Sequence, residues 1–215
     1  MKTQLKNNDL LLFIGDSITD CGRMDMFAPL GNGYVRMFTD MLTVREPEKN
    51  VQIINRGISG HTVEDLRNRW HEDAILHKPD WLSVKIGVND LHRYYMEENF
   101  DHLSPDGFNK IYDNILSVTR DALPECKIVL IDPFYLSTDD TTDAWRTEVL
   151  DLLSGYIDAV HAMSEKYGTR LVKTHTLFQE QLKSQHPDLY CDEPVHPNSA
   201  GHLLIAEAVY EALCK

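Results

Sequence analysis

The chain has few basic residues, few cysteines and no apolar run long enough to span a membrane. Its 215 residues include 21 lysines and arginines against 34 aspartates and glutamates, so the formal net charge is −13. Such a field repels phosphate backbones and anionic membranes, and we expect neither nucleic acid nor a membrane as a partner. A neutral substrate, such as a sugar or a simple ester, is not repelled.

The cysteines are too far apart to form a CxxC pair, which argues against a zinc site or a thioredoxin-type redox site. They are Cys21, Cys126, Cys191 and Cys214. We expect free thiols in a reducing cytoplasm. The start of the chain, "MKTQLKNNDLLLFIGDS", has a short apolar run with no small-residue cleavage site after it. It therefore does not resemble a signal peptide, and we expect a cytoplasmic protein.

Strand and helix patterns alternate along the whole length. Short apolar runs predict strands at 10–15, 51–55, 81–87, 127–131 and 170–173. Apolar residues three and four positions apart predict helices at 106–123, 144–167 and 200–214. The alternation predicts an α/β protein, a three-layer sandwich around a five-stranded parallel sheet. The length fits one domain over residues 1–215.

Sites in such sheets gather at the carboxyl ends of the strands, so four loops matter most: 15–23, 55–62, 87–93 and 190–198. The first contains "GDSITD", in which Ser17 follows Asp16. A turn and helix cap explains this triplet by itself, but a serine at this point could also be a nucleophile. The second contains "NRGISGHT". Its glycines fit a strand-to-helix turn capped by Thr62, or a backbone N–H of Gly60 that faces a cleft.

The other two loops carry an amide and an imidazole. Asn89, in "IGVND", is either an ordinary turn residue or a neutral N–H donor. His196, in "CDEPVHPNSAGH", lies three positions after Glu193 and four after Asp192, and Pro197 is expected to begin a helix. A carboxylate three residues earlier in a turn can fix the tautomer of a histidine and leave its Nε2 as a base.

Each of these signals has a structural explanation when it is taken alone. Together they place a nucleophile, a base, a carboxylate and two N–H donors at strand ends on one edge of the sheet. That set is what acyl transfer through a tetrahedral oxyanion requires. The combination favours a catalytic interpretation.

Four motifs of the chain, in order, resemble those of the SGNH or GDSL-type hydrolases. They are "GDS", the last glycine of "GISG", "GVND" and a carboxylate-x-x-His, and they span residues 15–196. The strings "LLFIGDSITDCGR", "GNGYV", "GISGHTVEDLRNRW" and "KPDW" are similar to bacterial acetylxylan esterases of that family. The resemblance implies a flavodoxin-like SGNH fold, no metal or cofactor, and removal of acetyl groups from short xylo-oligosaccharides. Related esterases also imply a homo-oligomer.

By position, the resemblance makes Ser17 the nucleophile and His196 the general base and acid. The N–H of Ser17, the N–H of Gly60 and the side-chain amide of Asn89 would form the oxyanion hole. The family has an aspartate three residues before the histidine, where this chain has Glu193. We expect Glu193 to orient His196, with Asp192 as the substitute.

Alternative functions differ in class. The run "LLLFIGDSIT" loosely resembles the start of haloacid-dehalogenase-type phosphatases, with Asp16 as nucleophile, but Ile18 stands where that chemistry needs a second acid. A lipase of broader short-chain ester specificity and a non-catalytic carbohydrate-binding relative are the others. We expect bracing roles for residues near the motifs, with Arg23 also able to hold substrate, His61 at the cleft and the tryptophans in packing. These residues are Asp20, Arg23, His61, Trp81, Asp90 and Trp145.

Overall fold

A parallel sheet forms the centre of the molecule. The computed structural model describes residues 1–97, 100–137 and 144–214. The five strands are β1 (Leu10–Gly15), β2 (Gln52–Gly57), β3 (Trp81–Lys85), β4 (Lys127–Ile131) and β5 (Arg170–Val172). Their spatial order is β2-β1-β3-β4-β5, and every neighbouring pair is parallel. The predicted α/β architecture with a five-stranded parallel sheet is therefore confirmed.

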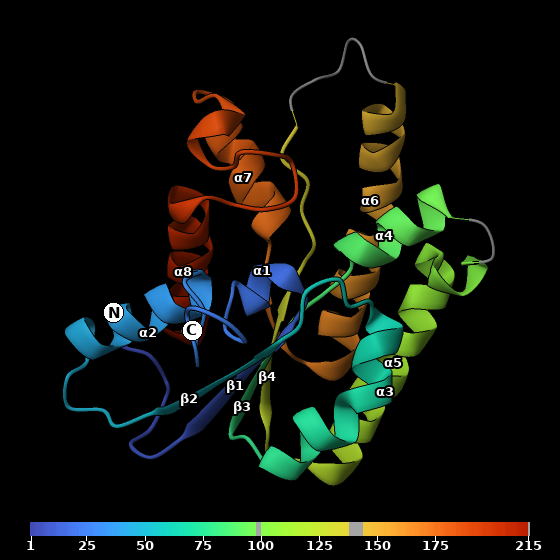
Figure 1. Cartoon of the computed structure of the whole chain (residues 1–215). Coiled ribbons are helices and arrows are strands. Elements are labelled where there is room, and N and C mark those ends of the chain that lie inside the picture. The colour runs from blue at the N-terminus through green and yellow to red at the C-terminus, as the bar shows by residue number, and fades with distance from the viewer. Residues whose placement is uncertain (98–99, 138–143, 215) are drawn as a thin grey trace.

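Helices cover both faces of the sheet (Figure 1). On one side α2 (Tyr34–Arg45) packs against α8 (Ser199–Cys214), which adjoins α7 (Thr174–Leu182). On the other side α5 (Pro105–Ala122) packs between α3 (Val63–Asp73) and α6 (Ala144–Tyr167). The shorter helices α1 (Ser17–Asp20) and α4 (Val88–Met96) follow β1 and β3 directly. Short 3₁₀ helices lie at Ile75–His77, Asp101–Leu103 and Pro187–Leu189.

Local sequence explains these elements. In α5, Ser104 accepts a hydrogen bond from the backbone N of Gly107 at 3.3 Å, and Pro105 occupies the first turn, where a missing N–H costs nothing. The buried side of α5 recurs every three or four residues, from Phe108 to Thr119. Strand β1 is buried from Leu11 to Gly15, as expected for a strand covered on both faces.

The last helix begins later than the sequence predicts. Pro197 was expected to open it, but α8 starts at Ser199, and Pro197 instead forms a β-bridge with Cys191. The side chain of Asn198 accepts hydrogen bonds from Ala200 N at 2.9 Å and Gly201 N at 3.3 Å. Asn198 therefore caps the helix, and the proline is left to close the preceding loop.

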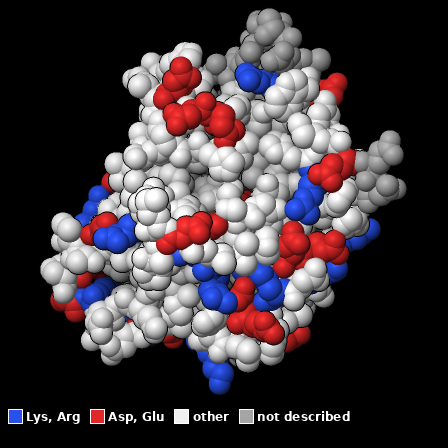
Figure 2. Space-filling model, viewed as in Figure 1, with Lys and Arg blue, Asp and Glu red and all other residues white. Residues whose placement is uncertain are grey.

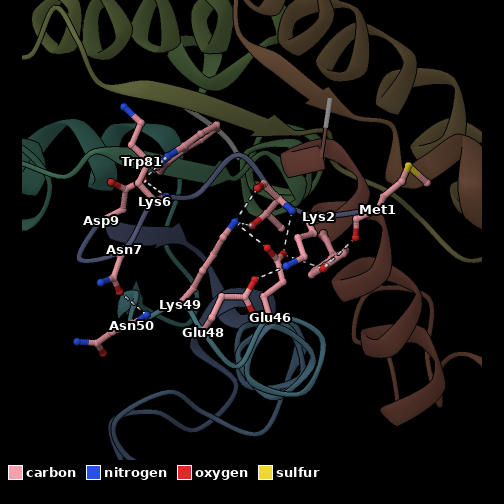
Figure 3. A network of polar contacts seen from close by, with 12 residues as sticks. Met1, Lys2, Lys6, Asn7, Asp9, Glu46, Glu48, Lys49, Asn50 and Trp81 are labelled. Carbon is pink, nitrogen blue, oxygen red and sulfur yellow. Dashed lines mark hydrogen bonds and ion pairs between the residues drawn. The ribbon is translucent and has the colours of Figure 1, made fainter.

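The segment before β1 is held by a polar network around Glu46, at the end of α2 (Figure 3). The fully buried carboxylate of Glu46 accepts from Thr3 N at 2.8 Å and from the Tyr210 hydroxyl at 2.8 Å. Lys49 lies 2.7 Å from the same carboxylate and also donates to the Thr3 carbonyl at 2.7 Å. Residues from the start of the chain, α2 and α8 are thus joined by one buried charge.

The register of the strands aligns the ends that carry the motifs. Gly15 pairs with Gly57 on one side and with Lys85 on the other, and Lys85 pairs with Ile131. The loops after β1, β2, β3 and β4 therefore leave the sheet at the same level and on the same edge. Within the described part of the chain, no helix is both long enough and apolar enough to cross a bilayer.

Candidate active site

The serine turn is held from below by its preceding residue. Asp16 caps α1, and its Oδ1 accepts from Ile18 N at 3.0 Å. Ser17 is half-buried, whereas Asp16 and Ile18 are buried on either side of it. Gly15 has to be glycine, because a Cβ there would lie 2.2 Å from the carbonyl oxygen of Lys85. The tight strand-to-helix turn thus exposes the serine hydroxyl and buries the carboxylate next to it.

The histidine loop is closed on itself and attached to the sheet. The bridge between Cys191 and Pro197 closes it, and Asn198 N donates to the Tyr190 carbonyl at 2.8 Å. Leu136, in the segment after β4, donates its N–H to the carbonyl of Pro194 at 2.8 Å. These bonds fix the loop across the edge of the sheet where β1 ends.

Within this geometry three side chains form a chain of hydrogen bonds. Ser17 Oγ lies 2.8 Å from His196 Nε2, although the two residues are 179 positions apart. The other ring nitrogen, Nδ1, is hydrogen-bonded to Oε1 of Glu193. A carboxylate at Nδ1 favours the tautomer with the proton on Nδ1, which leaves Nε2 to accept the proton of Ser17.

The carboxylate beside the histidine is Glu193 and not Asp192. Glu193 also accepts from Val195 N at 3.0 Å and from His196 N at 2.8 Å. Burial by itself would raise the pKa of Glu193, but these hydrogen bonds and the imidazole outweigh it and lower that pKa. Asp192 is exposed, and among the described residues none is hydrogen-bonded to it. The extra methylene of glutamate is therefore accommodated by the loop.

The loop of Gly60 is bonded to the serine turn. Ile58 N donates to the Gly15 carbonyl at 3.0 Å, and the hydroxyl of Ser59 donates to Asp20 at 2.7 Å. Gly60 has a φ of +79°, a backbone region that favours glycine, and a Cβ there would meet no atom within 4 Å. The carbonyl of Gly60 accepts from Arg93 at 3.0 Å. The loop is braced from both sides while its tip stays open.

Asn89 is oriented by the same loop. It stands in the first turn of α4, and its Nδ2 donates to the carbonyl of His61 at 3.0 Å. A primary amide has two N–H groups, so this bond fixes the amide and leaves its second N–H for another acceptor. Thr62 caps α3 in a reciprocal pair with Asp65, as the turn interpretation predicted. The structural and catalytic interpretations of this loop are thus compatible.

Arg69, on α3, is a residue of this site that the sequence reasoning missed. It donates to the carbonyl of Gly15 at 3.1 Å and to Nδ1 of His61 at 3.1 Å, and it pairs with Asp73 at 2.7 Å. Burial lowers the pKa of Arg69, which Asp73 opposes. One signal was present: Arg69 lies between Leu66 and Asp73 on the buried face of α3. Arg69 thus ties the serine turn to the glycine loop.

The residues expected to brace the loops do so. Asp90 is completely buried and accepts from Val63 N at 2.9 Å, and burial raises its pKa to about 8. Arg23 donates to the carbonyl of Gly57. Trp81 is buried, whereas Trp145 is 37% exposed and meets Tyr135 edge to face.

The phosphatase alternative does not fit the position of Asp16. Its carboxylate is fully buried and its Oδ1 is engaged by the backbone of α1. A nucleophile must reach substrate, and here the hydroxyl of Ser17, not the carboxylate, is the group that is hydrogen-bonded to a base.

A polar hollow of about 390 Å³ lies beside Glu193. Residues from three segments line it, among them Leu136, Arg146, His186, Asp188 and Asp192. In Figure 2, acidic side chains gather over the region where α7 and the loop after it lie in Figure 1. The surroundings of the histidine loop are therefore polar and negatively charged.

A family model described as the GDSL-like lipase/acylhydrolase family matches residues 13–204. The chain belongs to that family. The GDSL-like chain is 36% identical over 214 residues to the acetylxylan esterase of Geobacillus stearothermophilus, a match that covers 95% of this chain and 94% of the relative. The predicted family is confirmed, and the protein is a carboxylic ester hydrolase of the GDSL type.

Solved structures agree with the sequence match. A variant of Axe2, an acetylxylan esterase from G. stearothermophilus, superposes with a TM-score of 0.88 at 34% identity and covers 98% of this chain and 96% of its own. LAE5, described as an alpha/beta hydrolase enzyme from the metagenome of Lake Arreo, Spain, has a TM-score of 0.85 at 31% identity, with 97% and 96% covered. Axe2 variants described as catalytic mutants replace a serine, an aspartate or a histidine, the last two three positions apart.

Proposed function

We propose that this GDSL-type esterase removes acetyl groups from carbohydrate, with acetylated xylo-oligosaccharides as the substrate class, through an acetyl-serine intermediate. One observation carries the proposal: the hydrogen-bonded series from Ser17 through His196 to Glu193. The spacing of Glu193 and His196 equals that of the aspartate and histidine replaced in the Axe2 catalytic mutants. The relative's name supports acetylated xylan as the source of the substrate.

In the first half of the reaction, Ser17 Oγ attacks the acetyl carbonyl carbon while its proton passes to His196 Nε2. The N–H of Ser17, the N–H of Gly60 and the amide of Asn89 are the donors we assign to the oxyanion. Such donors stabilise the charge that develops on the carbonyl oxygen. The carbon–oxygen bond to the sugar then breaks, and the sugar oxygen takes the proton from His196.

Water completes the cycle. It attacks the acetyl group on Ser17 and gives a proton to His196, and the ester bond to Ser17 breaks. Acetate leaves, and the proton returns from His196 to the serine oxygen. Glu193 stabilises the imidazolium in both halves. Every group used in these steps belongs to this chain, to the ester or to water.

The polar hollow beside Glu193 supports a hydroxyl-rich leaving group. A guanidinium, an imidazole and carboxylates line it, and such groups hydrogen-bond sugar hydroxyls. The acidic surroundings disfavour anionic esters. Both features support a neutral carbohydrate ester over a long-chain lipid ester, which would need an apolar trough.

Hydrolysis of 4-nitrophenyl acetate tests the reaction, and release of acetate from acetylated xylo-oligosaccharides tests the substrate. We expect Ser17→Ala and His196→Ala to remove nearly all activity while the protein stays folded. Mass spectrometry of rapidly quenched enzyme should show an acetyl group on Ser17. Faster turnover of longer acyl esters or acetylated amino sugars would overturn the substrate assignment and leave the esterase chemistry intact.

A further inference from the structure

Lys85 is a buried cation directly beneath the serine turn. It is the last residue of β3, paired in register with Gly15, and its side chain is 0% exposed. Its ammonium lies 3.8 Å from Oδ2 of Asp16 and 4.9 Å from the centre of the Phe134 ring. Among the described residues, neither Lys85 Nζ nor Asp16 Oδ2 has a hydrogen-bond partner. The two groups therefore face each other inside the protein.

The other carboxylate near Lys85 is satisfied by different residues. Asp132, directly after β4, is hydrogen-bonded to His161 Nε2 at 2.9 Å, to the Thr174 hydroxyl at 2.7 Å and to His175 N at 3.2 Å. Asp16 has only the bond from Ile18 N to its Oδ1 within the described chain, and its Oδ2 is left to the ammonium. Lys85 is consequently the counter-ion of Asp16.

The charge on Asp16 matters because this residue immediately precedes Ser17. Attack on an ester creates a second negative charge, the oxyanion, close to the backbone N–H of the serine. Two negative charges repel strongly where water is excluded, because the effective dielectric constant there is low. An uncompensated carboxylate at Asp16 would therefore oppose the reaction that Ser17 performs.

We propose that Lys85 is a positioning residue of the esterase: its ammonium neutralises and holds Asp16, so that the serine turn presents Ser17 without a net negative charge beneath the oxyanion. This inference rests on the proposed function and adds to it a residue outside the serine, histidine and oxyanion motifs. Lys85 acts through Asp16 and does not touch the substrate.

The surroundings of the ammonium are those in which a buried lysine keeps its charge. Burial lowers the pKa of Lys85, while the carboxylates of Asp16 and Asp132 oppose that fall. The ring of Phe134 adds the negative face of an aromatic system. Lys85 also adds to the fall in the pKa of His202 on α8, which shows that its field extends beyond Asp16.

The test compares Lys85→Met with the double variant Lys85→Met/Asp16→Asn. Methionine keeps the length of the side chain and removes the charge, whereas asparagine keeps the cap on α1 and removes the charge that Lys85 balances. Turnover of 4-nitrophenyl acetate is measured per active site, with sites counted by covalent labelling of Ser17 with an organophosphate. Thermal unfolding confirms that each variant is folded.

We expect K85M to lower kcat per labelled site by about 10- to 100-fold, with KM changed by less than about threefold, because the charge acts on the transition state. The double variant should regain about tenfold of that loss, although it lacks both charges. Lys127→Met is the matched control: its ammonium also lies over an aromatic ring, Trp81, at 4.7 Å, but at the opposite end of the sheet. Its kcat should equal that of the unmodified enzyme.

A purely structural role for Lys85 would lower the number of labelled sites or the unfolding temperature and leave kcat per site unchanged, which would overturn the inference. Failure of the double variant to regain activity would also overturn it. If K85M does not fold, Lys85→Gln replaces it in the same comparison, and the same recovery is required. Absence of esterase activity in the unmodified enzyme would instead refute the proposed function.

Discussion

Glu193 contacts His196 at two points, through the ring nitrogen Nδ1 and through the backbone N–H at 2.8 Å. The same carboxylate oxygen accepts both bonds, so the glutamate fixes the ring and the loop that carries it. This double contact resolves the choice between Glu193 and Asp192, since Asp192 points to solvent. It also leads to the first prediction.

Glu193→Ala is expected to lower kcat by about 10²- to 10⁴-fold, because the imidazole loses both its orientation and its stabilising charge. Asp192→Ala should leave kcat within about twofold, since an exposed carboxylate without a protein partner contributes little. Hydrolysis of 4-nitrophenyl acetate by both variants provides the measurement. Equal and small effects would show that neither carboxylate serves His196.

Asn89→Ala is expected to lower kcat by about 10²- to 10³-fold with a small change in KM, as found when one oxyanion donor is removed. The amide is already oriented by its bond to the His61 carbonyl, so its donor needs little rearrangement in the transition state. Asn114→Ala, at an exposed position of α5, is the control and should have unchanged kinetics. A large rise in KM with constant kcat would assign Asn89 to substrate binding instead.

His202 should make the protein less stable as the pH falls from about 6.5 towards 4. Burial, with added repulsion from Lys85 and His196, lowers the pKa of His202 from 6.5 to about 4. Tyr34 N donates to its Nδ1 at 3.2 Å, so the ring is neutral in the folded protein, whereas the unfolded chain takes up the proton at higher pH. The stabilisation is therefore complete above pH 6.5 and is lost progressively below it, by about 3 kcal/mol at pH 4.

Urea unfolding between pH 7 and pH 4 measures this dependence. His202→Asn keeps an acceptor for the N–H of Tyr34 and removes the titrating ring, so its unfolding free energy should fall less steeply over the same range. Identical slopes for the two proteins would contradict the assignment of the dependence to His202.

Glu46→Gln is expected to lower the unfolding free energy at pH 7 by about 2–4 kcal/mol, because a buried carboxylate with charged and neutral donors is lost. Burial would raise the pKa of Glu46, but Lys49, Thr3 and Tyr210 lower it to about 2. The ionised form therefore stabilises the fold above about pH 4.5, and this contribution disappears as the pH falls towards 2.

The matched control for Glu46 is Glu48→Gln in the same network (Figure 3). Glu48 pairs with Lys2 at the surface, where water screens the interaction, so little change is expected. Chemical denaturation of both variants at pH 7 and pH 3 separates them. A variant at Glu46 as stable as the one at Glu48 would show that the buried network does not hold the start of the chain.

The architecture could be predicted because the sheet is buried on both faces. Continuous apolar runs marked the strands, and the helix at 144–167 was found at the same bounds because its apolar residues keep a regular spacing. Pro197 was misjudged, since the capping side chain belongs to the next residue, Asn198. Proline favours a helix start, but it cannot show which residue supplies the cap.

The site was only partly predictable. Strand ends of a parallel sheet lie on one edge, so the motifs of Ser17 and His196 were expected near each other before any contact was visible. Arg69 and Lys85 were not found, because a charged residue on a helix or strand ordinarily faces solvent. Only the register, which places Lys85 beside Gly15, shows that this strand end is enclosed. The catalytic roles themselves stay predictions until the variants are assayed.

The hydroxyl of Ser17 and the imidazole of His196 come from opposite ends of the polypeptide. During synthesis the nucleophile emerges early, but it has no base until almost the whole chain has left the ribosome. A nascent chain therefore cannot cleave an ester. For the same reason, a protease that trims the carboxyl end past the histidine loop would silence the enzyme without touching β1.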